Sequence, residues 1–302
     1  MGKLKLGLLI FVLNFSINAF LFSSETIRIS VISLKNFGDT KAGKEAHLHF
    51  IASRIADQAI KGVTVVDELQ DIDQSAMKKL LTAVRSVAHD SINLILSDRV
   101  GDKRQEQFGF FWNTKLLDTL GAVQILNSNI FDRDPAFISF KANAGFDFTL
   151  CAFHTKPDGK PNELRKELGQ LDDIFKQIQD MDENENDIIF VGDFNAPPDK
   201  LSQTGQNICI TDSLGDMTSS MKFVIRDVPT NLKQSKVYDN IFFELSNTTE
   251  YVEGPQHVIR LDSMLDEFTG EIEGDYSLKW FNDNVMDHCP IYAVFRADID
   301  DD

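Results

Sequence analysis

Hydrophobic and polar residues follow two different spacings along the chain, which predicts strands interleaved with amphipathic helices. Segments with apolar residues at alternate positions or in short unbroken runs predict strands at 27–32, 63–66, 94–96, 108–112, 122–126, 136–140, 148–153, 188–191, 241–243 and 291–295. Apolar residues three or four positions apart predict helices at 48–59 and 77–84 and one long helix at 164–178. Strands mixed with helices favour a layered α/β sandwich.

The first 24 residues are typical of a signal peptide. Lys3 and Lys5 precede an apolar run at 6–22, and small residues follow it before Glu25. A membrane anchor is the alternative because the run is long, but polar residues interrupt it. We therefore expect a signal peptide at 1–24 and a secreted protein, extracellular or periplasmic, with no membrane contact after cleavage. No linker or repeat divides the remainder, so 25–302 is predicted to be one domain.

Charge restricts the substrates that such a protein can bind. The formal net charge is -17, so the surface as a whole repels nucleic acid. A polyanionic substrate would need a local basic patch, divalent cations or both. Arg99, Lys103 and Arg104 form a short basic segment, which is either a solvated turn or a contact for a DNA backbone. The three cysteines allow at most one disulfide bond.

The strongest local signal for chemistry follows the strand predicted at 188–191. Asp193 and Asn195 lie two positions apart, so in an extended chain their side chains point the same way. A carboxylate there can accept a proton or bind a cation while the carboxamide donates to a phosphoryl oxygen. A strand followed by an Asx turn is the structural alternative.

Other predicted strands carry acids and histidines at their ends in the same way. Glu68 and His154 each follow a strand, whereas Asp239 and the pair at 287–288 precede one. Each residue alone has an ordinary structural explanation, such as solvation or capping. Their recurrence at so many strand ends favours a shared site instead.

These residues carry a resemblance to a known family. The segment Gly-Asp-Phe-Asn-Ala at 192–196 and the segment His-Thr-Lys-Pro at 154–157 resemble two motifs of the endonuclease/exonuclease/phosphatase superfamily, and within it of deoxyribonuclease I. Glu68 and the segment at 287–291 match its metal-binding glutamate and its carboxy-terminal Asp-His. The resemblance implies an α/β fold with four layers, in which two packed mixed β-sheets carry helices on their outer faces. It also implies that 25–302 is a catalytic domain.

Two further segments resemble the nuclease branch of the superfamily. Glu106 precedes an aromatic strand as in deoxyribonuclease I, and the Arg-Asp-Pro at 133–135 resembles its Arg-Glu-Pro. The resemblance implies that Glu106 pairs with His154, and that Arg133 contacts a substrate phosphate. The alternative for Arg133 is a salt bridge with a neighbouring aspartate.

The resemblance also assigns the remaining roles. Glu68 and Asp287 would bind Mg²⁺, which Mn²⁺ could replace, and structural Ca²⁺ is a further possibility. Asp239 would pair with His288, so that two carboxylate–imidazole units face the phosphate. Asp193 would position water or a second cation. Asn195 would hydrogen-bond the phosphate, and the product would carry a 5′-phosphate.

Some positions depart from the family pattern. The expected asparagine of the first strand falls on Ser33, which is predicted to contact the substrate. Asn36, three residues on, is expected to point the other way along an extended strand. Gln70 and Arg104 replace an arginine and a tyrosine at positions that would touch DNA. The cysteine pairs of vertebrate deoxyribonuclease I are also missing from their expected places.

The leading hypothesis is a secreted, metal-dependent endonuclease that cleaves DNA with little sequence preference, acts as a monomer and needs no stable protein partner. The alternative keeps the fold but acts on sphingomyelin or inositol phosphates; the nuclease-like segments at 106–108 and 133–135 argue against it. Abasic-site repair does not fit an export signal. A catalytically inactive binding protein is a third reading, supported only by Ser33.

Overall fold

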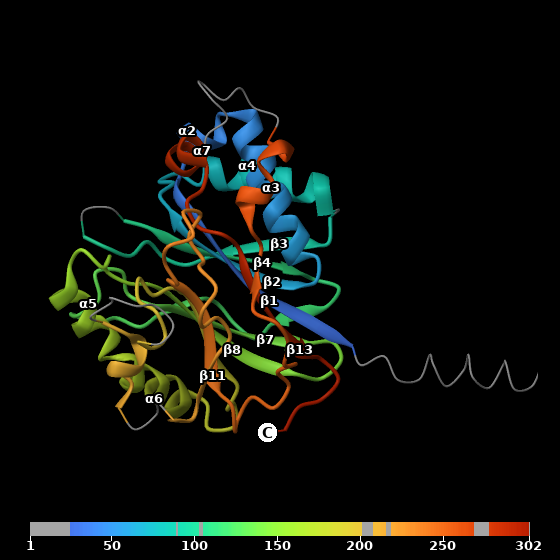
Figure 1. Ribbon diagram of the computed structural model, residues 1–302. Coiled ribbons are helices and arrows are strands. Elements are labelled where there is room, and N and C mark those ends of the chain that lie inside the picture. The colour runs from blue at the N-terminus through green and yellow to red at the C-terminus, as the bar shows by residue number, and fades with distance from the viewer. Residues whose placement is uncertain are drawn as a thin grey trace, which may run out of the picture.

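Two β-sheets pack face to face in the computed structural model of the chain (Figure 1). The structure describes residues 25–88, 90–102, 105–200, 208–215, 219–268 and 278–301. The predicted signal peptide at 1–24 lies outside these residues, as do Lys103 and Arg104. Within the described part of the chain, no helix has the length and apolar character needed to cross a bilayer.

The first sheet has six strands in the order β12-β13-β1-β2-β4-β3. Their bounds are β1 Thr26–Phe37, β2 Gly62–Leu69, β3 Ile92–Leu96, β4 Gln107–Asn113, β12 His257–Val258 and β13 Ile291–Arg296. β1 and β2 run parallel, and the other neighbours pair antiparallel. β1 and β2 therefore end at the same edge of the sheet at which β4 begins.

The second sheet has seven strands, with β10-β11-β9-β8-β7-β5 in order and β6 paired to β7. Their bounds are β5 Leu117–Thr119, β6 Gln124–Ile125, β7 Ala136–Ala142, β8 Asp147–His154, β9 Ile188–Asp193, β10 Met221–Phe223 and β11 Asp239–Glu244. β8 and β9 are parallel, and β11 returns antiparallel to β9. As a result β8 and β9 end where β11 begins.

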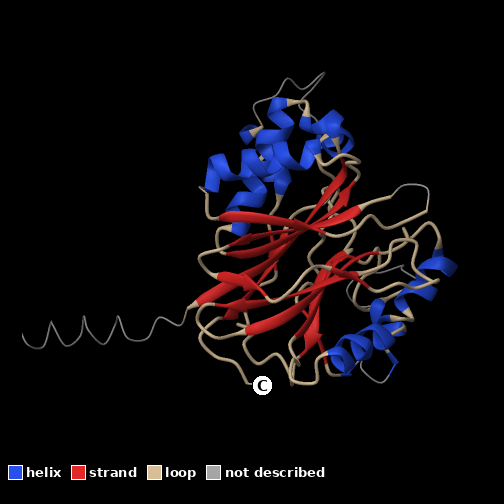
Figure 2. Cartoon of the chain, turned by 180° about the vertical axis from the view of Figure 1, so that it is seen from behind, coloured by secondary structure: helices blue, strands red, loops and turns tan. Residues whose placement is uncertain are grey.

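Helices cover the outer face of each sheet, which confirms the predicted four-layer sandwich (Figure 2). Beyond the first sheet lie α2 (Asp39–Ala42), α3 (Glu45–Ala59), α4 (Ser75–Ala88) and α7 (Leu278–Asn284), and beyond the second lie α5 (Pro161–Leu168) and α6 (Leu171–Met181). The 3-10 turns among the described residues are Ile210–Asp212, Leu261–Ser263 and Leu265–Glu267.

Three apolar clusters separate these layers. The largest fills the space between the sheets with phenylalanine, isoleucine and valine side chains. A second lies between the first sheet and α3 and α4, and a third lies between the second sheet and α5 and α6. Burying each large apolar side chain contributes roughly 1.5–3 kcal/mol, so these clusters fix how the sheets stack.

Most predicted strands are present, but the helix predicted at 164–178 is wrong as a single element. It is broken into α5 and α6 at Gly169, whose N–H closes α5 on the carbonyl of Arg165. Both halves keep their apolar sides on the second sheet, with Leu168 and Leu171 buried on either side of the break. The apolar spacing continued through the break, so periodicity alone predicted one helix. The run at 122–126 supplies only the two residues of β6.

Candidate active site

The stripe of core residues facing the space between the sheets changes from apolar to polar at one edge. On β8, Leu150 and Ala152 belong to the inter-sheet core, and side chains two positions apart share a face, so His154 points the same way. The same alternation holds for β1, β2, β9 and β11 and for the residues that enter β4. In each case the next inward-facing position beyond the apolar core residues is polar, which adds five further residues: Ser33, Asp67, Asp193, Asp239 and Glu106. The strand register therefore gathers these groups at one end of the core.

Glu106 and His154 form the first carboxylate–imidazole pair. Oε2 of Glu106 lies 2.8 Å from Nδ1 of His154, and both side chains are buried. The Arg133 guanidinium donates from Nε to the His154 carbonyl at 2.9 Å and lies 3.5 Å from Glu106 Oε2. Arg133 also reaches Asp132 at 3.6 Å, so the predicted aspartate salt bridge exists alongside a place in the site.

Asp239 and His288 form the second pair, contributed by β11 and the segment before β13. Oδ2 of Asp239 lies 2.8 Å from Nδ1 of His288, and the other oxygen accepts a hydrogen bond from the Ser33 hydroxyl at 3.2 Å. His288 Nε2 lies 4.0 Å from Oδ2 of Asp193. Ser33 was predicted to contact substrate. It is 2% exposed, and its hydroxyl instead positions the Asp239 carboxylate.

Asp193 and Asn195 are fixed by the backbone at the end of β9. The Asn195 N–H donates to Asp193 Oδ1 at 2.8 Å, and the Asn195 carboxamide donates to the Thr155 carbonyl at 3.1 Å. Gly192 is required just before them, because it has φ +140° and an added Cβ would lie 1.9 Å from the Phe153 carbonyl oxygen. β8 and β9 can therefore approach closely enough to set His154 beside Asp193.

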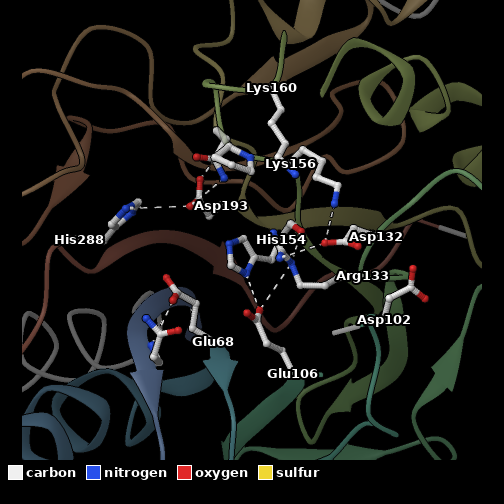
Figure 3. A pocket seen from close by; sticks show the side chains of 13 residues that line it. Glu68, Asp102, Glu106, Asp132, Arg133, His154, Lys156, Lys160, Asp193 and His288 are labelled. Atoms are coloured by element: carbon white, nitrogen blue, oxygen red, sulfur yellow. Dashed lines mark hydrogen bonds and ion pairs between the residues drawn. The ribbon is translucent and has the colours of Figure 1, made fainter. Parts of the chain in front are cut away.

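These residues open onto a cleft of about 590 Å³ (Figure 3). Glu106, His154, Asp193 and His288 converge in it, and Glu68 lies across the cleft from the lysines. The full lining is Asn36, Glu68, Asp102, Glu106, Asp132, Arg133, His154, Lys156, Pro157, Lys160, Asp193, Asn195 and His288. The polar ends of both sheets thus share one opening to solvent.

Burial and charge pairing shift the protonation of the central groups. Burial alone would lower the pKa of His154, but the hydrogen bond with Glu106 and the charges of Glu68 and Asp67 together raise that pKa to about 9. Burial also lowers the pKa of His288, but the charges of Asp239 and Asp193 outweigh it and raise that pKa well above the usual range. Burial and then the charge of Asp239 raise the pKa of Asp193 to about 6. At neutral pH both imidazoles are cations beside an ionised Asp193.

Glu68 and Asp287 lie at the side of the cleft formed by the first sheet. The Asn36 N–H donates to Glu68 Oε2 at 3.1 Å. Asp287 Oδ2 forms an ion pair with Lys35 Nζ at 3.0 Å. The other carboxylate oxygen of Asp287, Oδ1, is buried and has no hydrogen-bond partner among the described residues. Asp67, directly before Glu68, is also buried with both carboxylate oxygens unpartnered, and burial raises its pKa well above the usual range.

This donor set fits a hard divalent cation, which prefers carboxylate oxygen. Unpartnered buried carboxylate oxygens are costly unless a cation or a hydrogen-bond donor meets them. Asp193, Asp239 and His288 also offer ligand atoms that all lie within 4.8 Å of one another. Acidic groups able to hold a metal are therefore present on both sides of the cleft.

A half-buried lysine joins the two chain segments of the first-sheet side. Lys41 Nζ donates to the carbonyls of Leu34 at 2.8 Å, Lys35 at 2.6 Å and Val285 at 2.7 Å. Burial lowers the pKa of Lys41 to about 8. This ammonium ties the end of β1 to the segment that carries Asp287.

The expectation that Asn36 points away from the site is wrong. β1 is not extended there, because Lys35 and Asn36 have φ values of 47° and 57° and the pairing with β2 shifts between Ser33 and Phe37. The bulge turns Asn36 into the cleft, where its carboxamide oxygen accepts a hydrogen bond from Gln70 at 2.6 Å.

The predicted DNA-contact residues lie in different settings. Gln70 Nε2 also reaches Glu106 Oε1 at 3.4 Å, so it belongs to the polar network of the cleft. Arg99 donates to the backbone carbonyls of Asp71 and Gln105, and so braces the loop before β4. Lys103 and Arg104 fall outside the described residues. The three cysteines are buried separately as free thiols.

Sequence reasoning missed the basic residues of the opposite wall. Lys156 and Lys160 line the cleft beside Arg133, and Lys156 Nζ lies 2.6 Å from Asp132. Their position two and six residues beyond His154 was a usable signal. It was overlooked because lysines in a turn are usually solvated.

Comparisons with known proteins agree with this geometry. No family model matches the chain. Curated deoxyribonuclease-1 proteins of Gallus gallus and Rattus norvegicus are each 27% identical over 180 residues, covering 57% of this chain. Deoxyribonuclease-1-like 2 of Mus musculus is 25% identical over 174 residues. The matched segments span about 61% of the two deoxyribonuclease-1 chains.

Solved structures share the fold at lower sequence identity. An endonuclease/exonuclease/phosphatase family protein from Bacteroides thetaiotaomicron has a TM-score of 0.59 and 14% identity, covering 89% of this chain and 95% of that one. An AP endonuclease from Archaeoglobus fulgidus has a TM-score of 0.59 and 12% identity, covering 89% and 99%. At these identities the likeness establishes the fold alone.

Proposed function

We propose, from the endonuclease/exonuclease/phosphatase fold of this chain and its similarity to deoxyribonuclease I, that the protein is a divalent-cation-dependent endonuclease. It hydrolyses DNA phosphodiester bonds with little sequence preference and leaves 5′-phosphate ends. The observation that carries the proposal is the pair of carboxylate–imidazole units, each with an Nδ1 to carboxylate distance of 2.8 Å, opening onto one cleft with Asp193 and Asn195.

In the proposed reaction, water attacks phosphorus and the bond from phosphorus to the 3′ oxygen breaks. Asp193, ionised above about pH 6, orients the water and accepts its proton. His154 is protonated up to about pH 9, so its Nε2 can give a proton to the leaving oxygen while Nδ1 stays bound to Glu106. Hydrolysis then leaves the phosphate on the 5′ side and a hydroxyl on the 3′ side.

Negative charge builds on the phosphoryl oxygens during the attack. The His288 imidazolium, held by Asp239 and adjacent to Asp193, stabilises that charge, and the Asn195 carboxamide hydrogen-bonds the phosphate. Arg133 adds a further positive charge to the lining of the cleft. These fixed donors need no rearrangement as the charge appears.

Glu68 and Asp287 would hold Mg²⁺ or Mn²⁺, a Lewis acid that neutralises a phosphoryl oxygen when bound. The Lys35 ammonium at Asp287 would compete with that cation or share its carboxylate. Structural Ca²⁺ remains part of the proposal. DNA is the proposed partner, and the enzyme is proposed to act as a monomer after export by the signal peptide at 1–24.

The test is a substrate panel. Purified full-length protein is incubated with supercoiled plasmid, RNA, sphingomyelin and inositol phosphates, each with Mg²⁺, Mn²⁺, Ca²⁺ or EDTA. We expect nicking and linearisation of the plasmid with a divalent cation and none with EDTA, and loss of nicking in Asp193→Asn. Lys279→Ala, which changes an exposed residue of α7, serves as the control.

End-labelling of the nicked plasmid decides the bond that breaks. A 5′-phosphate and a 3′-hydroxyl are expected. A plasmid left intact under every cation condition would refute the proposal, and turnover of sphingomyelin or an inositol phosphate in its place would favour the alternative substrate class.

A further inference from the structure

Asp67 is a buried acid for which the proposed reaction has no use. It is the last residue of β2 that pairs regularly with β1, where it stands level with Ser33. Its side chain is 1% exposed, and neither carboxylate oxygen has a hydrogen-bond partner among the residues that the structure describes. The one hydroxyl hydrogen of Ser33 is donated to Asp239. Asp67 thus lacks the partner that a buried carboxylate normally requires.

The strand pattern directs Asp67 toward the catalytic groups. Val63 and Val65 belong to the inter-sheet core, and Asp67 continues that stripe by two residues. The charges of His154, Glu68 and Asp193, which belong to three different strands of the two sheets, act on Asp67. Asp67 is not one of the residues that line the cleft, but it lies beneath them and not in a separate part of the core.

A backbone irregularity brings Glu68 to the same region. Neighbouring residues of an extended strand face opposite sides, so Glu68 would ordinarily point toward the helices. Glu68 instead has φ 58°, and the pairing of β2 with both neighbours shifts across this position. The bulge turns Glu68 into the cleft beside Asp67. The charge of Glu68 consequently acts on the carboxyl of Asp67.

A hard divalent cation accounts for this arrangement better than a hydrogen-bond donor does. The Arg133 guanidinium is occupied by the carbonyls of His154 and Thr155, and Lys35 by Asp287 and a backbone carbonyl. A cation between the acids would offset the desolvation of Asp67, and oxygen ligands are what such cations prefer.

We infer that Asp67 is an additional carboxylate of the divalent-cation centre, acting with Glu68 from beneath the cleft. The inference rests on the proposed function only in taking the cation of hydrolysis as the ligand. It makes the centre more anionic than Glu68 and Asp287 alone.

The test measures cation binding directly, without substrate. Mg²⁺ and Mn²⁺ are titrated by calorimetry into the full chain, into Asp67→Asn and into Asp57→Asn. Asp57 is the matched control, because it is a half-exposed acid on α3 paired with Arg54. We expect Asp67→Asn to weaken cation binding at least tenfold and Asp57→Asn to leave it unchanged. Thermal unfolding in EDTA and in Mg²⁺ supplies a second readout.

Thermal unfolding separates a ligand from a merely structural acid. Asp67→Asn replaces a buried carboxyl that has no hydrogen-bond partner among the described residues by a neutral side chain of the same size. The melting temperature of the variant in EDTA should therefore equal or exceed that of the parent, while its rise on adding Mg²⁺ should be smaller. Cation affinity within twofold of the parent would overturn the inference. If the asparagine variant does not fold, Asp67→Ser makes the same comparison with a smaller neutral side chain.

The inference and the proposed function fail separately. If Asp67→Asn weakens cation binding but the parent protein leaves plasmid intact, the inference about Asp67 holds and the nuclease proposal is refuted. If the parent protein cleaves plasmid but Asp67→Asn binds cations as tightly as the parent, the nuclease proposal holds and the inference about Asp67 is refuted.

Discussion

Replacing Glu106 by glutamine tests the acid role of His154 at a single atom. The substitution keeps the size of the side chain but replaces a carboxylate oxygen 2.8 Å from His154 Nδ1 by a neutral group. The remaining influences on the ring are burial and the Arg133 charge, which lower its pKa, and the charges of Glu68 and Asp67, which raise it. Because the Glu106 hydrogen bond is the largest influence that raises the pKa of His154, we expect that pKa to fall from about 9 toward the ordinary value of 6.5.

The size of the effect follows from that difference. A fall of about 2.5 pKa units, all the way to the ordinary value, would correspond to roughly 3 kcal/mol of interaction with the charged ring, at 1.36 kcal/mol per unit. At pH 7 such a fall would lower the protonated fraction of His154 from about 99% to about a quarter. A general acid in the wrong protonation state cannot donate to the leaving oxygen.

Two measurements check this expectation. Carbon–proton NMR spectra of the imidazoles across pH, with His154 assigned through a His154→Gln variant, report its pKa directly. In the pH dependence of kcat/KM for plasmid nicking, the alkaline limb should move from near pH 9 to lower pH. A His154 that still titrates near 9 in Glu106→Gln would refute the assignment of Glu106 as the cause.

Stability supplies an independent check with a definite sign. The folded pKa of His154 is raised above its unfolded value of 6.5, so the pair stabilises the fold fully below that pH and loses its effect as pH rises through about 9. Urea unfolding of parent and Glu106→Gln should therefore differ most near pH 6 and converge by about pH 10. A difference that grows with pH would contradict this.

Three further substitutions probe other parts of the site. His288→Ala should slow plasmid nicking by about 100-fold or more, and a near-parental rate would remove that ring from the mechanism. Lys35→Met removes the ammonium 3.0 Å from Asp287, so calorimetry should find tighter Mg²⁺ binding; equal or weaker binding would contradict competition between the two cations. Gly192→Ala places a Cβ 1.9 Å from the Phe153 carbonyl oxygen, and should cost about 3 kcal/mol or more in urea unfolding, whereas a loss below about 1 kcal/mol would mean that the two strands can separate there.

The position of the site was predictable from the sequence because its residues lie at the ends of strands, and the alternation of side chains along a strand is a local property of the sequence. Apolar residues at alternate positions of a strand identify the inward face, and the first polar residue on that face identifies the edge of the core. His154, Asp193 and Asp239 are found by this reasoning, and the motif resemblance supplied their pairing. The distances of 2.8 Å in both carboxylate–imidazole pairs agree with it.

Features that depend on backbone irregularity were not predictable in this way. Asn36 and Glu68 turn into the cleft through positive φ values, which neither residue type ordinarily favours strongly enough to be read from sequence. The break at Gly169 left the apolar spacing of the helices intact. Asp67 was overlooked because an acid directly before a recognised acid adds nothing to a motif, although its place on the inward face was already fixed by Val63 and Val65.

Charge connects these observations to the choice of substrate. The net charge of -17 means that the chain as a whole repels a polyanion. Its cleft nevertheless has one wall with Arg133, Lys156 and Lys160 and another with Glu68. The basic wall is partly neutralised, since Lys156 lies 2.6 Å from Asp132. Attraction of a phosphate therefore depends on cations bound at the acidic wall, where each divalent ion reverses the local sign of the potential. Added NaCl should then inhibit mainly because Na⁺ competes with the divalent ions at the acidic wall, and less because it screens the basic groups of the protein. Raising the Mg²⁺ concentration at fixed NaCl should therefore restore the rate.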